Sequence, residues 1–365
     1  MKHKLLYFCI LLSFCNHSIA QTHIVDIDNN TPIPFVHVIS DKGIILGTSN
    51  MDGIIDFRKI NASSNHENKS VSFHHISYQN EEWEMANLLN TDTVKLKQRV
   101  IAIPDIVITN KSQEPVYLVL KGFYRSYQIE NGIPKYYTDG IVEYYISKNQ
   151  FKNRVIQHRS FRNKMLVDAE KKRVNMVSIV AACTPYINAK TEIDELDKEY
   201  SIEKEMDKQF IKKQNAIVGS IIQDKQSRLF QVNIDLIAPE TDQTRSLFNY
   251  TSKITSIDIT ESYSSTDFTN IIKDDLVSRK EYRKIYFKHK KDKKYFEIDV
   301  VDEFYVFDKQ YLYKSDLKGL DLSSNFSLKE SCSYSNEYWK EFQKYNMLKL
   351  PEYIEKLLGT TLEKY

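Results

Sequence analysis

The chain has 365 residues, of which 51 are lysine or arginine and 49 are acidic. This near-neutral balance lacks the basic surface expected of a nucleic-acid-binding protein. There are only nine glycines, and the sequence contains neither a P-loop nor a GxGxxG pattern, so nothing in it indicates nucleotide binding.

Residues 1–20 have the pattern of an export signal. Two lysines precede an apolar run at residues 5–15, and small residues follow up to Ala20, as they do before a signal-peptidase cleavage site. The run is shorter than the ~20 apolar residues of a membrane span, which makes a retained anchor the less favoured alternative. We expect a mature chain that begins at Gln21, has no transmembrane span, and lies in the periplasm or at the periplasmic or outer face of the outer membrane.

Removal of that segment leaves two cysteines, Cys183 and Cys332. They form no CxxC or Cys/His cluster, which excludes the usual zinc frameworks. In an oxidising compartment they would either pair, closing a long loop worth ~4 kcal/mol, or remain two separate buried thiols. The sequence does not fix the distance between them and leaves both alternatives open.

Residues 21–110 contain short apolar segments separated by turns, such as the polar turn Asn50–Gly53. The predicted strands lie at residues 36–39, 44–46, 54–57, 71–75 and 94–96. Short strands at this spacing predict an immunoglobulin-like β-sandwich. The polar segment Thr109–Pro115 predicts the boundary with a second region, residues 111–365.

The order of these segments resembles the carboxypeptidase regulatory-like domain, a transthyretin-like β-sandwich common in exported proteins of Bacteroidetes. The matching pieces are Asp28, residues 31–39, Gly47-Thr48, Asp52-Gly53, residues 71–78 and residues 94–96. The chain departs from the family at Asp26, where the family usually has glycine. The resemblance implies a module for attachment or spacing that carries no peptidase chemistry.

Residues 111–365 are rich in β-branched and aromatic residues, which favour strands. The predicted strands lie at residues 116–129, 135–146, 228–238, 281–290 and 294–313. Two stretches, residues 191–214 and 336–358, have mostly helical spacing, and Pro351 interrupts the second. We therefore expect a mostly β protein whose second region is α+β, with a curved antiparallel sheet and a few helices.

Tyrosines gather in the first part of this second region. The candidate binding face for a sugar or a peptide consists of Tyr124, Arg125, Tyr136, Tyr137 and Tyr144, because aromatic side chains and arginine are enriched at interfaces. The alternative is that these tyrosines pack within and between strands, since tyrosine is a good strand former.

Asp139 and Glu143 lie four residues apart in a predicted strand, so alternation places them on one face. Two carboxylates on one face are the acid and base of glycoside cleavage. The favoured alternative is a cross-strand contact between Arg125 and Glu143 or plain solvation of these charges.

No catalytic, cofactor-binding or metal-ligating residue is assigned. The histidines lack the spacing of a metal site, and no GxSxG elbow or cysteine-protease signature occurs. The segment Asp92-Thr93-Val94 resembles the short O-glycosylation motif of Bacteroidetes, with Thr93 as the acceptor; the alternative is an ordinary strand residue.

The sequence as a whole predicts a non-catalytic, exported cell-envelope protein. Its β-sandwich would bind or dock an envelope protein or a polysaccharide, for example by strand addition to an exposed edge. The alternative is an envelope hydrolase of glycans or peptides with its active site in residues 111–365.

Overall fold

The computed structural model describes nine stretches of the chain. They are residues 21–57, 69–107, 114–147, 151–172, 180–205, 208–224, 229–247, 249–265 and 270–365. The predicted export signal, residues 1–20, and most of the predicted boundary, residues 108–113, lie outside them.

The first region forms two small sheets that pack around one core, here called the sandwich. One sheet has the order β4-β1-β7 and the other has the order β3-β2-β5-β6. Their strands are β1 (Thr22–Asp26), β2 (His37–Ser40), β3 (Ile45–Thr48), β4 (Ile54–Ile55), β5 (Ser70–His74), β6 (Glu81–Glu84) and β7 (Thr93–Leu96), and the short helix α3 (Met85–Leu88) follows β6. β1 pairs with β7 in parallel, and the other pairs are antiparallel.

The two central strands of the second small sheet, β2 and β5, are buried on both faces. Val38 and Phe73 are partners across β2 and β5, and both are fully buried in the sandwich core. His37 and His74 are also cross-strand partners, and alternation turns them to the opposite face. They are buried there too, against the large sheet of the second region.

The second region is built on a 13-stranded sheet, here called the large sheet. Its order is β12-β13-β14-β15-β17-β18-β19-β9-β10-β11-β20, with β16 paired to β17 and β8 paired to β19. Its strands are β8 (Ile106–Val107), β9 (Tyr117–Glu130), β10 (Ile133–Ile146), β11 (Phe151–Arg162), β12 (Tyr200–Glu205), β13 (Lys208–Lys213), β14 (Ala216–Asp224), β15 (Leu229–Asp235), β16 (Gln243–Leu247), β17 (Tyr250–Tyr263), β18 (Leu276–His289), β19 (Phe296–Leu312) and β20 (Glu363–Lys364). The helices of this region are α4 (Lys164–Lys172), η2 (Lys273–Asp275), η3 (Lys314–Leu317), η4 (Tyr338–Lys340) and α5 (Glu352–Leu357).

The five strands predicted in this region are confirmed, and they are long enough to make an extensive curved sheet. The tight turn between β9 and β10 follows from Asn131 and Gly132, whose φ angles of 49° and 73° suit a two-residue hairpin loop. The protein is therefore mostly β with a large curved antiparallel sheet and few helices, as the sequence predicts.

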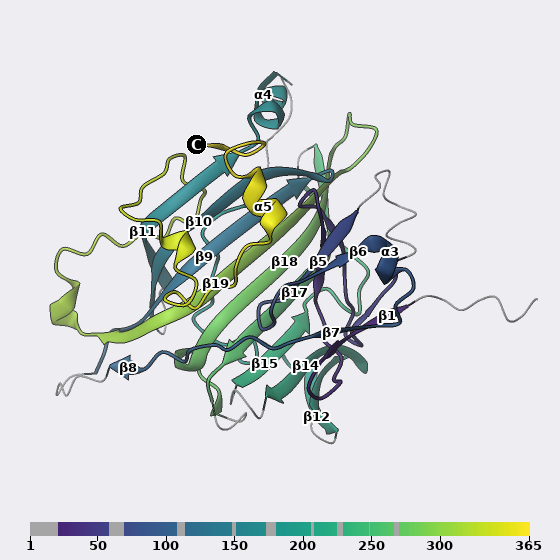
Figure 1. Ribbon diagram of the computed structural model, residues 1–365. Helices are drawn as coiled ribbons and strands as arrows, with labels where there is room; N and C mark the ends of the chain where they lie inside the picture. The colour runs from purple at the N-terminus through teal and green to yellow at the C-terminus, as the bar shows by residue number, and fades with distance from the viewer. Residues whose placement is uncertain are drawn as a thin grey trace, which may run out of the picture.

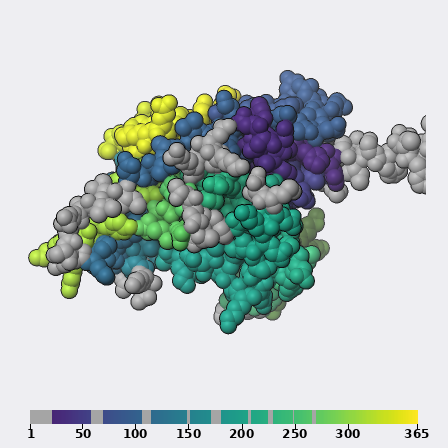
Figure 2. All heavy atoms as spheres, turned by 90° about the horizontal axis from the view of Figure 1, so that it is seen from below, coloured from purple at the N-terminus to yellow at the C-terminus, as the bar shows by residue number. Residues whose placement is uncertain are grey.

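The two faces of the large sheet have different covers. The docking face, which carries Arg125, Asp139 and Glu303, is covered by the sandwich and by residues 336–365, here called the C-terminal segment. Figure 1 shows α5 and the sandwich on the same side of the sheet, and Figure 2 shows the purple and blue sandwich and the yellow C-terminal segment together on that side. The other face, the core face, is covered by residues 181–196 and holds a large hydrophobic cluster.

The helix predicted at residues 191–214 is wrong. Residues 200–205 and 208–213 form the hairpin β12–β13 at one end of the large sheet, where Lys212 pairs with Glu203 across the strands. The spacing of the apolar side chains favoured a helix. In the structure, β13 instead pairs with the edge of β14, and this pairing satisfies its backbone hydrogen-bonding groups.

The helix predicted at residues 336–358 is largely irregular. Only η4 and α5 are helical there, and α5 begins directly after Pro351, at the predicted interruption. None of the helices in the described stretches has the length and apolar character that crossing a bilayer requires.

Candidate functional site

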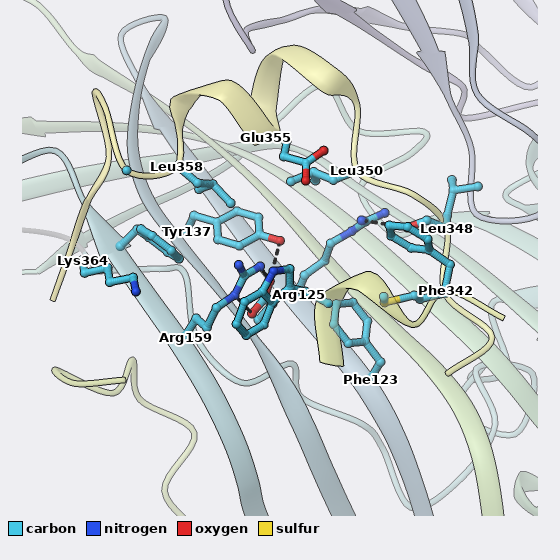
Figure 3. Close-up of a pocket in the computed structure, with 15 residues that line it drawn as sticks. Phe123, Arg125, Tyr137, Arg159, Phe342, Leu348, Leu350, Glu355, Leu358 and Lys364 are labelled. Carbon is cyan, nitrogen blue, oxygen red and sulfur yellow. Dashed lines mark hydrogen bonds and ion pairs between the residues drawn. The ribbon is translucent and has the colours of Figure 1, made fainter. Parts of the chain in front are cut away.

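A cavity lies between the docking face and the C-terminal segment, and we call it the roofed cavity. Its volume is about 250 Å³. The floor comes from β9, β10 and β11, and the roof comes from the C-terminal segment, as Figure 3 shows. The floor residues are Phe123, Arg125, Tyr137, Asp139, Arg159 and Phe161, and the roof residues are Trp339, Phe342, Met347, Leu348, Leu350, Glu355, Leu358, Gly359 and Lys364.

Strand register explains why the polar floor residues meet. Arg125, Asp139 and Arg159 are cross-strand partners on β9, β10 and β11. Directly opposite residues on one face of a sheet have Cβ atoms about 5 Å apart. A row of alternating charge therefore crosses three strands beneath the roof.

Asp139 is a fully buried carboxylate with several donors around it. It accepts hydrogen bonds from Arg159 (Nε, 2.9 Å), from the hydroxyl of Tyr137 (3.0 Å) and from the hydroxyl of Tyr338 (2.8 Å). Arg159 also donates through Nη2, so the pair is bidentate. Burial and the nearby Asp139 charge raise the pKa of Tyr137 and of Tyr338, which keeps both hydroxyls protonated as donors.

Arg159 is a fixed cation in the cavity wall. Its side chain is 9% exposed, and its guanidinium lies 3.8 Å from the ring centre of Trp339, at cation–π distance. Burial opposes the charge, but Asp139 raises the pKa of Arg159 above its ordinary value. The remaining nitrogen, Nη1, has no hydrogen-bond partner within the stretches that the structure describes.

Arg125 ties the floor to the roof. Its Nη1 donates to the backbone carbonyl of Leu348 (3.0 Å), its Nη2 donates to the hydroxyl of Tyr305 (3.2 Å), and its Nε donates to Glu303. The Oε1 of Glu303 in turn lies 2.6 Å from the Nε2 of His74 in the sandwich. Burial alone would raise the pKa of Glu303, but the charges of Arg125 and His74 hold it well below its usual range.

The sandwich also holds the roof directly. Asn80 donates to the carbonyl of Lys349 (2.8 Å), Arg99 donates to the carbonyl of Asn346 (2.9 Å), and Tyr353 donates to the carbonyl of Ile39 (3.1 Å). These bonds fix three points along the C-terminal segment. The roofed cavity therefore depends on the sandwich, although no sandwich residue lines it.

The candidate binding face of tyrosines does not exist as one exposed surface. Tyr124, Tyr136 and Tyr144 are at most 2% exposed and point to the core face, where Tyr144 donates to the carbonyl of Pro185 (2.6 Å). Arg125 and Tyr137 point to the docking face and line the roofed cavity. The period of two along the strands separates the five residues, and both faces of the sheet are covered.

The expected Arg125–Glu143 contact is absent from the described contacts, because Arg125 lies opposite Asp139 and bonds to Glu303. Glu143 lies opposite Lys121 on the same pair of strands, and its Oε1 lies 3.4 Å from the Nζ of Lys121. Glu143 does not line the roofed cavity. Asp139 and Glu143 share the docking face but serve separate ion pairs.

The other predicted positions are placed as follows. Thr93 is exposed at the start of β7, as an acceptor of O-glycosylation must be. Cys183 and Cys332 are both free; the backbone of Cys183 bonds to Ser126 on β9, and Cys332 lies against Ser160 on β11. In the described stretches, no three histidine, cysteine or acidic side chains are grouped closely enough to hold a metal ion.

The sequence did not single out Arg159, Trp339 or Lys364 as site residues. Arg159 is one of several charges on β11, and its partner Trp339 is 180 residues away, so no local pattern joins them. The available signal was the aromatic content of the chain end, which includes Trp339 and Phe342.

Two comparisons of the sequence with known proteins found no match. No protein-family model matches the chain. No curated protein matches it in sequence either. The resemblance to the carboxypeptidase regulatory-like domain therefore stays a prediction from the residues of the sandwich.

Proposed function

We propose that this protein is an exported, non-catalytic binding protein of the cell envelope, whose ligand occupies the roofed cavity. The observation that carries the proposal is the cavity itself. Its walls are mostly apolar and aromatic, with a few polar groups in fixed positions, which is the general form of a small-molecule site.

The charges of the cavity floor favour binding over catalysis. Asp139 is held by Arg159 and two tyrosine hydroxyls, and Arg125 is held by Glu303. A general acid or base has to exchange a proton with its substrate, and a carboxylate that already accepts this set of hydrogen bonds is poorly suited to do so. A hydrolase built on Asp139 and Glu143 therefore has little support.

The sandwich is proposed as a docking module of the carboxypeptidase regulatory-like type. One of its sheets is committed to the large sheet, whereas the sheet β4-β1-β7 presents exposed polar residues such as Thr93 and Lys95. An envelope protein or polysaccharide would dock on that second sheet. The bonds of Asn80 and Tyr353 to the C-terminal segment would then join the docked partner to the roof of the cavity. Export itself rests on the pattern of residues 1–20.

The test is capture of a small molecule by the chain from Gln21 onward. The protein is incubated with the small-molecule fraction of an envelope extract, washed and weighed by native mass spectrometry. Leu358 lines the cavity, so Leu358→Trp should exclude the retained compound because its larger side chain fills the space. The matched control is Leu247→Trp, which adds the same ring at a side chain that is 70% exposed on β16.

A compound retained by the parent and by L247W, but not by L358W, supports the proposal. Retention of nothing, or equal retention by L358W, contradicts it. Conversion of the retained compound by the parent protein would instead establish an enzyme.

A further inference from the structure

Two of the charged groups that line the roofed cavity are cations on its β11 side, whereas the Glu355 carboxylate lies on α5 above it. Arg159 uses Nε and Nη2 for Asp139 and keeps Nη1 without a partner in the described stretches, although the side chain is about nine-tenths buried. Lys364 on β20 also lines the cavity, and its Nζ donates to the hydroxyl of Tyr334 (2.9 Å), a neutral acceptor. Two cationic groups therefore face the same space, with the buried Asp139 carboxylate between them and the exposed Glu355 carboxylate on the roof.

Strand pairing keeps these two cations together. β20 pairs with β11, and Lys364 is the cross-strand partner of Phe161, two residues from Arg159. Alternation puts Arg159 and Phe161 on the same face of β11. Figure 3 shows Arg159 and Lys364 on one side of the cavity, while Glu355 comes from the helix above it.

The remaining walls require an apolar ligand body. The Trp339 ring lies against the Arg159 guanidinium, and Phe342, Met347, Leu350 and Leu358 extend the apolar roof. A fully polar ligand such as a sugar would leave these side chains without apolar contact and would find few hydrogen-bond partners for its hydroxyls.

We infer that the roofed cavity binds a compact carboxylate with an apolar or aromatic body. The inference rests on the proposed function and adds the chemical class of the ligand. The carboxylate accepts hydrogen bonds from Nη1 of Arg159 and from Nζ of Lys364, and the body packs against Trp339 and Leu358. Charge-assisted bonds in a partly buried site are the strong ones, so the anion contributes specificity while the apolar walls contribute contact.

The experiment uses three probes of one shape that differ only in the end group: 3-phenylpropionate, 3-phenylpropanol and 3-phenylpropylamine. Binding to the chain from Gln21 onward is measured by isothermal titration calorimetry. The carboxylate should bind about tenfold or more tightly than the alcohol, which is the effect of one charge-assisted hydrogen bond, and the amine should bind most weakly.

Two variants locate the anion. Lys364→Met should weaken the binding of 3-phenylpropionate by about threefold to tenfold and leave the binding of 3-phenylpropanol unchanged. Arg159→Met should weaken the binding of 3-phenylpropionate more strongly. Lys290→Met is the matched control, since it removes one positive charge from the exposed turn between β18 and β19. Because Arg159 also holds Asp139, the exposed Lys364 provides the readout if the Arg159 variant does not fold.

The outcomes separate the two proposals. If the alcohol binds as tightly as the carboxylate, or if K364M and K290M behave alike, the ligand class is wrong while the cavity remains a binding site. If none of the three probes binds, and L358W changes nothing in the extract experiment, the proposed function fails as well.

Discussion

The Nε2 atom of His74, in the sandwich, lies 2.6 Å from the Oε1 atom of Glu303, in the large sheet. The two residues are 229 positions apart in the chain and are at most 4% exposed. Their contact continues through Arg125 to the carbonyl of Leu348. A single line of polar contacts thus joins the sandwich, the large sheet and the roof of the cavity.

Replacement of Glu303 by glutamine should strongly destabilise the protein. Arg125 would keep its charge in a buried position without the carboxylate that balances it, and breaking a buried ion pair by removing one partner costs about 3–5 kcal/mol. The measurement is the free energy of unfolding in urea. Glu297→Gln on the same strand removes a partly exposed pair with Lys284 and should cost at most about 1 kcal/mol. Equal effects of the two variants would show that the buried network does not stabilise the docked sandwich.

Replacement of His37 by phenylalanine should stabilise the protein. Both ring nitrogens of His37 are buried without a hydrogen-bond partner within the described stretches, and the ring lies edge-on to Tyr282 at 4.7 Å. An unsatisfied buried polar group costs about 1–3 kcal/mol, and phenylalanine keeps the ring contact without that cost. Urea unfolding near pH 7.5 measures the gain, and a loss of stability would contradict it.

The advantage of His37→Phe should grow in acid. Burial, with a smaller contribution from Lys280, lowers the pKa of His37 well below its ordinary value. Below about pH 6.5, His37 is therefore protonated in the unfolded chain but stays neutral in the folded protein. The free energy of unfolding consequently decreases as the pH falls below this value. The difference between H37F and the parent should widen from about pH 7.5 to about pH 5.5. His37→Asn should not stabilise the protein at pH 7.5, because it keeps a buried polar group. Since asparagine does not titrate, the free energy of unfolding of this variant should also rise relative to that of the parent as the pH falls. A gap that stays constant with pH for both variants would refute the assignment.

The two cysteines should be found as free thiols. Their anchors, Ser126 and Ser160, are both cross-strand partners of Thr138, so they lie two strand spacings apart, about 10 Å. A disulfide needs Cα atoms within about 7 Å. Burial raises the pKa of the Cys183 thiol to about 12, so that thiol should resist iodoacetamide near pH 8 until the protein is unfolded. Intact mass spectrometry checks both points, and a mass deficit of 2 Da, which a disulfide produces, would contradict the first.

Substitution of Gly140 by alanine should disturb the core face. A Cβ atom at this position would lie 2.2 Å from the carbonyl oxygen of Gln157 and 2.7 Å from Cε1 of Tyr124. The first contact is with backbone, so β11 would have to move, and such overpacking costs about 1–3 kcal/mol. Ser201→Ala, on the exposed edge strand β12, is the control and should change the free energy of unfolding by less than about 0.5 kcal/mol. A thermal shift measures both, and an unaffected melting temperature in G140A would show that the strands are less closely packed than described.

The strands were predictable because their signal is local. Residues 116–129 and 135–146 carry long β-branched and aromatic runs joined by Asn131-Gly132, and the structure pairs them as β9 and β10. The hairpin β12–β13 was missed because its charged residues fit a helical spacing, and only the neighbouring edge of β14 selects the strand conformation.

The candidate site was predictable only in part. The alternation of side chains along a strand shows which residues share a face of the sheet, but it does not show which segments pack on that face. Arg125 and Tyr137 were selected and do line the cavity, whereas Tyr124 and Tyr144 of the same strands are packed in the core face. Their burial depends on residues 181–196, whose position over the sheet has no local signal. Trp339 reaches Arg159 only through the full course of the large sheet.

The bracing of the roof by the sandwich has a consequence for the order of folding. The strands of the sandwich pair within their own region and can form early, because contacts between residues near in sequence close with little loss of entropy. The sandwich can dock on the large sheet only after β19, which carries Glu303, has joined that sheet. The C-terminal segment contacts both the sandwich and the large sheet, so it can cover the cavity only after the two have docked. Contacts of such long range slow folding. The roofed cavity is then the last part of the molecule to form, so a chain that stops before that step has a complete sandwich and a large sheet whose docking face is uncovered.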